Sequence, residues 1–171
     1  MRESEEAFPP ARLCDGGEVP YLGERLLLGV GTEALRRRAH VSRRGSELRV
    51  ALGPGMPLRD ALEAWYRRLA RVEVTPRLDA AVARAGRGYS SLQIRGQRTR
   101  WASCSTSGAM SFNWRLLLAP AEILDYVVEH EVAHLAVRDH SERFWALLAG
   151  RCPDWRERER WLRRHGHALR L

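Results

Sequence analysis

The sequence contains no lysine, few cysteines and no long hydrophobic run, and each absence narrows the classes of protein to consider. Cys14, Cys104 and Cys152 are widely separated and form no C-x-x-C pair, which argues against a zinc ribbon and a disulfide-stapled scaffold. Reduced thiols of this kind favour a cytoplasmic setting. The apolar run at residues 26–30 is far shorter than the roughly 20 residues of a membrane-spanning helix, so we expect no membrane association.

Without lysine, arginine carries all of the basic side-chain charge. The chain has 29 basic and 21 acidic residues, a net charge of +8 and a pI near 10.5. A guanidinium group stays charged and binds carboxylates and phosphates through paired hydrogen bonds. This composition is compatible with acidic partners, nucleic acid among them, and equally with a basic surface that contacts only water.

The N-terminal segment lacks the apolar stretch of a secretory signal peptide. Residues 1–19 are first acidic and then contain proline and glycine, which predicts a loosely ordered arm over residues 1–18. Residues 19–171 are numerous enough to bury a hydrophobic core, and we expect them to form a single domain.

Hydrophobic periodicity predicts both strands and helices. The predicted strands are 21–30, 48–52, 91–95, 101–105 and 109–118, with turns at 43–46 and 107–108. The predicted helices are 58–71, 77–85, 122–137 and 142–149, followed by one that begins at residues 153–154. Thr75-Pro76 is expected to interrupt the first helical stretch, because proline removes a helical hydrogen bond.

One motif in the predicted helix 122–137 carries recognisable chemistry. His130-Glu131-Val132-Ala133-His134 reads H-E-x-x-H. Residues four apart share a helix face, so both imidazoles can approach one ion while Glu131 acts on a water molecule. Leu124, Val128 and Leu135 form an apolar stripe on the opposite side. The helix is therefore expected to bury this stripe and present its histidine pair to a cleft.

A catalytic zinc ion usually has three protein ligands and one open position. His140 is the best candidate for the third ligand, because six residues after His134 allow the chain to leave the helix, turn and return. Glu142 is the rival, since glutamate also binds zinc. The residues alone leave this choice open.

A longer set of motifs surrounds these residues. It comprises Arg100-Trp101-Ala102-Ser103-Cys104-Ser105, Asn113-Trp114-Arg115-Leu116, Pro120, Tyr126-Val127-Val128, His140-Ser141 and Phe144-Trp145. In this combination and order, residues 100–145 resemble the YgjP-like, SprT-related (WLM-like) zinc metallopeptidases. Ala102 departs from the family pattern, which usually has glycine there.

The resemblance implies a fold, a cofactor and an activity. The fold is expected to be α+β and zincin-like, of the minimal gluzincin type, with a small antiparallel or mixed sheet packed on the H-E-x-x-H helix. His130, His134 and His140 are expected to hold one Zn²⁺ ion, with Glu131 as the general base. The expected reaction is hydrolysis of peptide bonds in a peptide or protein substrate.

Substrate binding and the alternative activities are less closely defined. Zincin-type proteases hold an extended substrate along an edge strand, for which Asn113 and its neighbours are the candidates. The side chains able to stabilise the oxyanion are Asn113, Arg115, Tyr126 and His165. Two alternatives remain: a metal-dependent hydrolase of nucleotides or other phosphate compounds, and a protease that acts on DNA-bound protein.

Overall fold

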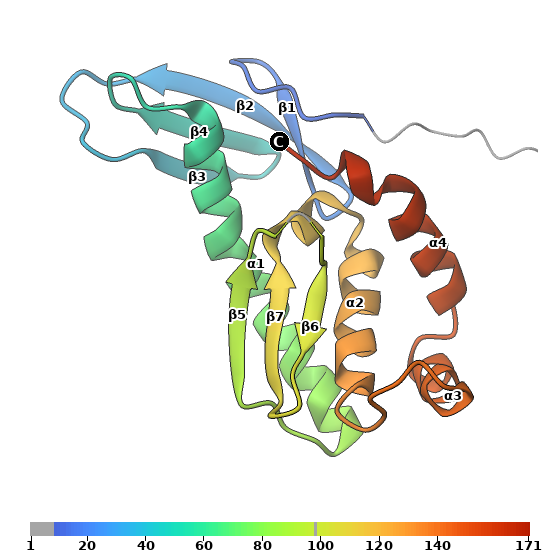
Figure 1. Ribbon diagram of the computed structural model, residues 1–171. Helices are drawn as coiled ribbons and strands as arrows, with labels where there is room; N and C mark the ends of the chain where they lie inside the picture. The colour runs from blue at the N-terminus through green and yellow to red at the C-terminus, as the bar shows by residue number, and fades with distance from the viewer. Residues whose placement is uncertain (1–8, 98) are drawn as a thin grey trace, which may run out of the picture.

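Two small mixed sheets and four α-helices make up the residues that the computed structural model describes, 9–97 and 99–171 (Figure 1). The predicted α+β class is confirmed. The strands are β1 (Glu18–Tyr21), β2 (Glu24–Thr32), β3 (His40–Arg44), β4 (Glu47–Leu52), β5 (Ser91–Arg95), β6 (Ala102–Cys104) and β7 (Ala109–Asn113). The helices are α1 (Leu58–Ala85), α2 (Ala121–Ala133), α3 (Glu142–Arg151) and α4 (Trp155–His165), with 3₁₀ turns η1 (Trp114–Leu118) and η2 (Gly166–Ala168).

The N-terminal sheet has the strand order β1-β2-β4-β3. β2 and β4 are parallel, and each pairs antiparallel with an outer strand. The predicted strand 21–30 is in fact a hairpin, because Leu22 and Gly23 both adopt positive φ and reverse the chain between β1 and β2. β3 is a polar edge strand that hydrophobic periodicity did not predict, since only Val41 in it is buried.

The second sheet has the order β5-β7-β6, with β7 in the centre. The predicted strand 109–118 is wrong in its second half, because the sheet ends at Asn113 and residues 114–118 form η1. The Asn113 side chain accepts a hydrogen bond from the Arg115 main chain at 3.1 Å and starts this turn. A strand would alternate its faces, whereas the turn buries both Leu116 and Leu117.

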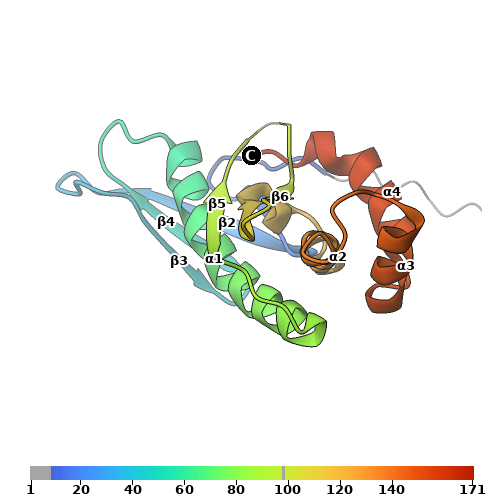
Figure 2. The ribbon, with the colours of Figure 1, turned by 60° about the horizontal axis from the view of Figure 1, so that its bottom comes forward.

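Helix α1 connects the two sheets. It runs from the N-terminal sheet to the far end of the three-stranded sheet (Figures 1 and 2). The predicted break at Pro76 does not occur, and the helix is continuous through it. Side chains supply donors near the break: Thr75 Oγ1 donates to the Arg71 carbonyl at 2.7 Å and Arg77 Nη1 to the Glu73 carbonyl at 2.9 Å. These bonds lie on either side of the Val72 carbonyl, which is the one that loses its helical amide partner at Pro76.

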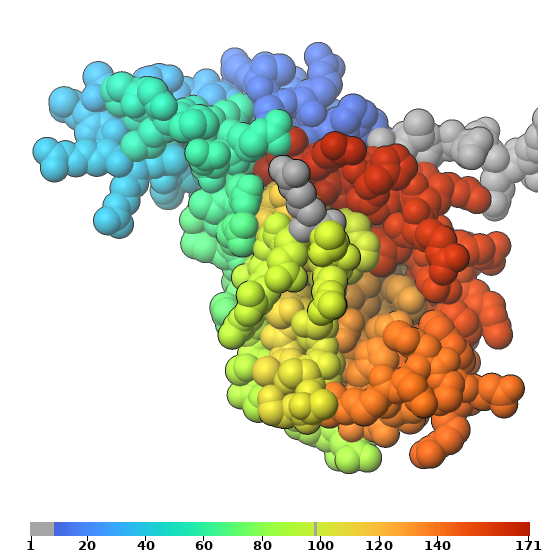
Figure 3. All heavy atoms as spheres, viewed as in Figure 1, coloured from blue at the N-terminus to red at the C-terminus, as the bar shows by residue number. Residues whose placement is uncertain are grey.

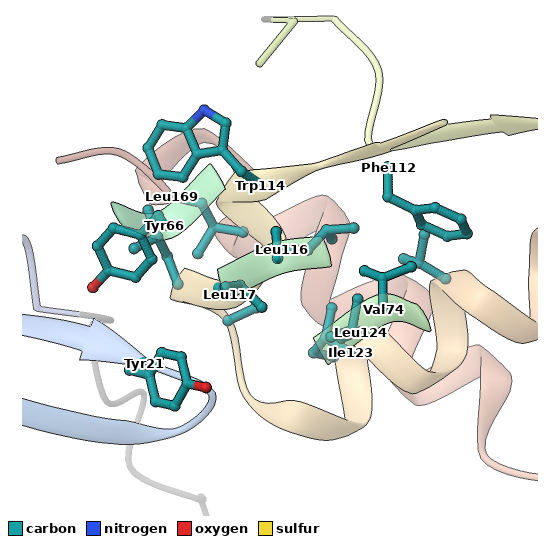
Figure 4. Packing of buried hydrophobic residues seen from close by; sticks show 14 of the residues in the cluster. Tyr21, Tyr66, Val74, Phe112, Trp114, Leu116, Leu117, Ile123, Leu124 and Leu169 are labelled. Carbon is teal, nitrogen blue, oxygen red and sulfur yellow. The ribbon is translucent and has the colours of Figure 1, made fainter. Parts of the chain in front are cut away.

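The core between the sheets is built on η1. Trp114 stacks on Tyr66 of α1 with ring centroids 5.7 Å apart, and Tyr66 donates to the Pro20 carbonyl at 2.5 Å. Figure 4 shows Leu116 and Leu117 in the same layer, between α1 and the start of α2. Helix α2, which carries most of the H-E-x-x-H motif, therefore starts from a rigid, buried platform.

The predicted N-terminal arm lies only partly within the described residues, since residues 1–8 fall outside them. Residues near its end are hydrogen-bonded to the first sheet: Gly16 donates to the Leu28 carbonyl and Asp15 accepts from the Val30 amide, each at 2.8 Å. Among the described residues, no helix combines the length and the hydrophobicity needed to cross a membrane.

Candidate metal centre

Helix α2 supplies two of the three candidate ligands. It ends at Ala133, four residues earlier than predicted, and His134 is its C-terminal cap. Leu124, Val128 and Val132 are buried, so this face is fixed by packing. His130 and His134 line the cleft on the other side, as the spacing predicted.

The segment after α2 returns His140 to the same place. His134 Nδ1 is 3.1 Å from the Val137 carbonyl oxygen, which holds the imidazole ring against the turn. Arg138 then donates to the main-chain oxygens of Ser105 and Thr106 at 2.6 and 3.0 Å. The chain is thus tied to the β6–β7 hairpin just before His140.

The three imidazoles converge. One ligand atom from each of His130, His134 and His140 lies within 4.8 Å of the other two. The Nε2 atoms of His130 and His140 are 3.1 Å apart, close to the roughly 3.3 Å that separates two nitrogens of a tetrahedral zinc site. Because Nδ1 of His134 faces a carbonyl, its Nε2 is left for an ion. This donor set fits Zn²⁺, and Glu142 lies outside the group and is exposed.

The electrostatics favour neutral imidazoles at His130 and His134, and the neutral form is the one that binds a metal. Burial, together with the neighbouring His134 and His140, lowers the pKa of His130 to about 4. Burial also lowers the pKa of His134. Among the described residues, His130 Nδ1 is buried without a hydrogen-bond partner.

Two aromatic residues of α3 support the rings. Phe144 is fully buried and stacks on His134 with centroids 4.5 Å apart, and its centroid lies 4.9 and 4.8 Å from those of His130 and His140. Trp145 stacks on His140 at 5.5 Å and on Trp155 at 4.3 Å. The rings are therefore oriented by packing rather than left free in solvent.

Glu131 lines the same cleft from the adjacent position on α2. Its side chain is almost completely buried, with 7% of the residue exposed. Burial raises the pKa of the Glu131 carboxyl to about 7. A carboxylate with a pKa near neutrality is suited to accept and return a proton.

The cleft has a volume of about 500 Å³ and lies between α2 and β6. β6 is the edge of its sheet, whereas Asn113, the predicted edge residue, lies in central β7. Trp101 O and Ser105 N bond to the β7 side. Because antiparallel pairing alternates, the main-chain groups of Ala102 and Cys104 point away from β7, toward the cleft.

Of the four side chains predicted to stabilise the oxyanion, one lines the cleft. Tyr126 lines the cleft, with its ring 5.9 Å from that of His130. Asn113 instead donates to the carbonyls of Gln97 and Arg100, and His165 packs on Trp161. Arg115 lines a neighbouring cavity.

Sequence reasoning missed two arginines of the cleft, Arg100 and Arg138. Arg100 begins the motif that runs through β6, and Arg138 lies between two candidate ligands. These positions within the motifs were the signal in the sequence that could have identified them, because their charge does not distinguish them from the other arginines.

Three imidazoles around one point, beside a buried carboxylate, are the donor set of a metal-dependent hydrolase. The chain belongs to the YgjP-like family: residues 1–165 match its metallopeptidase domain. The predicted resemblance to YgjP-like proteins is thereby confirmed, and the protein is a metallopeptidase. The relation to SprT proteins stays a prediction.

No curated protein matches the sequence. Among solved structures, the chain is similar to the metallopeptidase zymogen of Pyrococcus abyssi abylysin, with 24% identity and a TM-score of 0.48. The match covers 53% of this chain and 93% of that chain.

Proposed function

We propose that this protein is a zincin-like, zinc-dependent peptidase with a single metal ion held by His130, His134 and His140. The observation that carries the proposal is the convergence of these three imidazoles in one cleft with the buried carboxylate of Glu131. The family match supports hydrolysis of peptide bonds in peptides or proteins.

When bound, zinc would act as a Lewis acid on the scissile carbonyl and lower the pKa of water at the site. Glu131 then accepts a proton from the attacking water and passes it to the leaving amine. Its burial beside the three imidazoles supports this role.

The substrate binds in extended form along β6. Ala102 and Cys104 offer main-chain donors and acceptors on the cleft side, so the peptide adds as a further strand without a requirement for a particular sequence. Tyr126 donates a hydrogen bond to the developing oxyanion. Burial raises the pKa of its hydroxyl, which keeps the proton available for this role.

Residues 19–171 act as one domain in the cytoplasm. The single-domain assignment is supported by α1, which packs against both sheets. The setting is supported by the three cysteines, which are free thiols.

The test is the substitution Glu131→Gln, with Glu122→Gln on the exposed side of the same helix as its control. Peptide and nucleotide substrates are assayed side by side with zinc-loaded proteins. We expect Glu131→Gln to bind zinc normally and to lose peptide hydrolysis by at least about a hundredfold, while Glu122→Gln keeps it. Unchanged cleavage by Glu131→Gln, or hydrolysis of nucleotides alone, would overturn the proposal.

A further inference from the structure

A second cavity of about 660 Å³ adjoins the metal cleft at the N-terminal end of β6. Arg100, Trp101 and Leu162 line both spaces, so the two are neighbours that share a wall. A Cβ atom on Gly166 would come within 2.8 Å of the Trp101 ring, so the glycine lets η2 pack closely on this wall. Figure 3 shows the segment near residue 100 beside α4 on one face.

Positive charge predominates in this cavity, where five guanidinium groups face one carboxylate, that of Leu171. Its arginines are Arg59, Arg100, Arg115, Arg163 and Arg170, and none of the described side chains that line it is acidic. The cavity is therefore a site of predominantly positive potential.

Main-chain contacts hold several of these guanidinium groups in place. Arg59 donates to an oxygen of the Leu171 carboxylate, Arg115 to the Gly96 carbonyl at 2.9 Å and Arg170 to the His167 carbonyl at 2.9 Å. Arg163 forms an ion pair with Glu159 at 3.1 Å. The carboxylates of Leu171 and Glu159 offset part of the charge of Arg59 and Arg163, whereas a carbonyl orients the Arg170 guanidinium without neutralising it. The cavity therefore keeps an excess of positive charge with which to bind an anionic group.

The direction of β6 relates this cavity to the scissile bond. The chain runs from Arg100 beside the cavity through β6 to Cys104, which Arg138 of the ligand-bearing segment approaches at 3.9 Å. Four residues of extended chain span about 13 Å. A peptide paired antiparallel to β6 would therefore send its C-terminal side from the metal centre toward the arginines.

We propose that this arginine cavity binds acidic side chains of the substrate, about three to four residues on the C-terminal side of the scissile bond. The proposal rests on the peptidase function proposed above and defines its substrate class. A peptide is favoured over nucleic acid because the cavity continues the strand-binding edge. Its described lining also contains a single large aromatic ring, Trp101, whereas single-stranded nucleic acid stacks on successive rings.

Binding is measured first, without turnover. Fluorescein-labelled peptides with Asp or Asn at these positions are titrated into zinc-loaded Glu131→Gln protein, and anisotropy gives Kd. We expect the Asp peptide to bind about 5- to 10-fold more tightly at low salt and to lose this advantage at high salt. The added double substitution Arg163→Gln/Arg170→Gln removes the preference, whereas Arg160→Gln/Arg156→Gln, with the same charge change outside this cavity, retains it.

Cleavage by the wild-type, zinc-loaded protein separates the two proposals. A peptide library read by mass spectrometry should show Asp and Glu enriched on the C-terminal side of the cleaved bonds. Cleavage without that enrichment, or with an enrichment that Arg163→Gln/Arg170→Gln leaves unchanged, sinks the cavity proposal alone. No cleavage of any peptide sinks the peptidase function. Loss of oligonucleotide binding in the double variant, with peptide affinity unchanged, would assign the cavity to nucleic acid instead.

Discussion

Among single residues, His140 tests the metal centre most directly. It comes from a loop, whereas His130 and His134 come from one helix. We expect His140→Ala to weaken zinc binding by more than about 100-fold, because even loss of a ligand's hydrogen-bond partner costs 10- to 100-fold. Glu142→Ala should leave affinity unchanged, since Glu142 lies outside the group. Competition with a chromophoric chelator measures both, and the reverse order would reassign the third ligand to Glu142.

Glu131 gives the metal-free protein a defined pH dependence. Burial raises its pKa from 4.5 to about 7, so the folded chain retains a proton that the unfolded chain releases between these values. The associated stability is present below pH 4.5 and is lost as the pH rises through 7. We therefore expect metal-free Glu131→Gln to be more stable than wild type by up to about 3 kcal/mol above pH 8.

Urea unfolding at pH 4, 6 and 8 with chelator present measures this difference. His130 has the opposite effect, because its pKa is lowered to about 4 and its stability contribution is lost as the pH falls below 6.5. This loss is the same in wild type and in Glu131→Gln, so it does not affect the difference in stability between them. A difference in stability that is the same at all three pH values would contradict the burial of the Glu131 carboxyl.

The residues of the candidate site were predictable because the short spacing between them in the sequence determines which side chains lie together. H-E-x-x-H places two imidazoles on one face of any helix, and the resemblance supplied His140. Arg100 and Arg138 could not be found in the same way. Their proximity to the cleft depends on the pairing of β6 with β7 and on two bonds to carbonyls of the hairpin, which are long-range contacts that spacing does not encode.

At the scale of elements, periodicity located the helical segments, but it did not give the boundaries of the helices and strands. The error at residues 109–118 arose because alternation of Phe112, Trp114, Leu116 and Leu118 looks the same in a strand and in a buried 3₁₀ turn. The interruption expected at Pro76 does not occur: α1 continues through it and packs along its length against α2, η1 and both sheets. Tertiary context decided both cases, as it does wherever a short apolar run fits two structures.

Arg138 links two elements of the site, the segment after α2 and the β6–β7 hairpin. We expect Arg138→Ala to lower stability by about 1 kcal/mol and to reduce both zinc affinity and kcat/KM, the latter by about tenfold. The reason is that the hairpin no longer holds the chain that carries His140. Arg143→Ala, on the exposed face of α3, is the control, and equal effects of the two substitutions would disprove a positioning role for Arg138.

For the whole molecule, the fold and the metal centre are separable. The core between the sheets is formed by α1, η1 and the strands, without the three imidazoles. We expect a chelator to abolish peptide hydrolysis while the far-UV circular dichroism at 25 °C stays unchanged. The Tm should fall by an amount that depends on free zinc, because an ion that binds only the folded state stabilises it by mass action. Complete unfolding on chelation would show that the metal holds the fold together.

The early end of α2 has a kinetic consequence. Two imidazoles sit on the last turn of a helix whose other side is buried, and the third sits on a segment held by contacts of Val137 and Arg138. An ion that enters the site would first bind His130 and His134, and would bind His140 when residues 135–141 close over it. The rate at which the ion exchanges with solution should therefore be limited by the opening of residues 135–141. A protein that binds the ion tightly at equilibrium could still release it quickly when the contacts of this segment are lost.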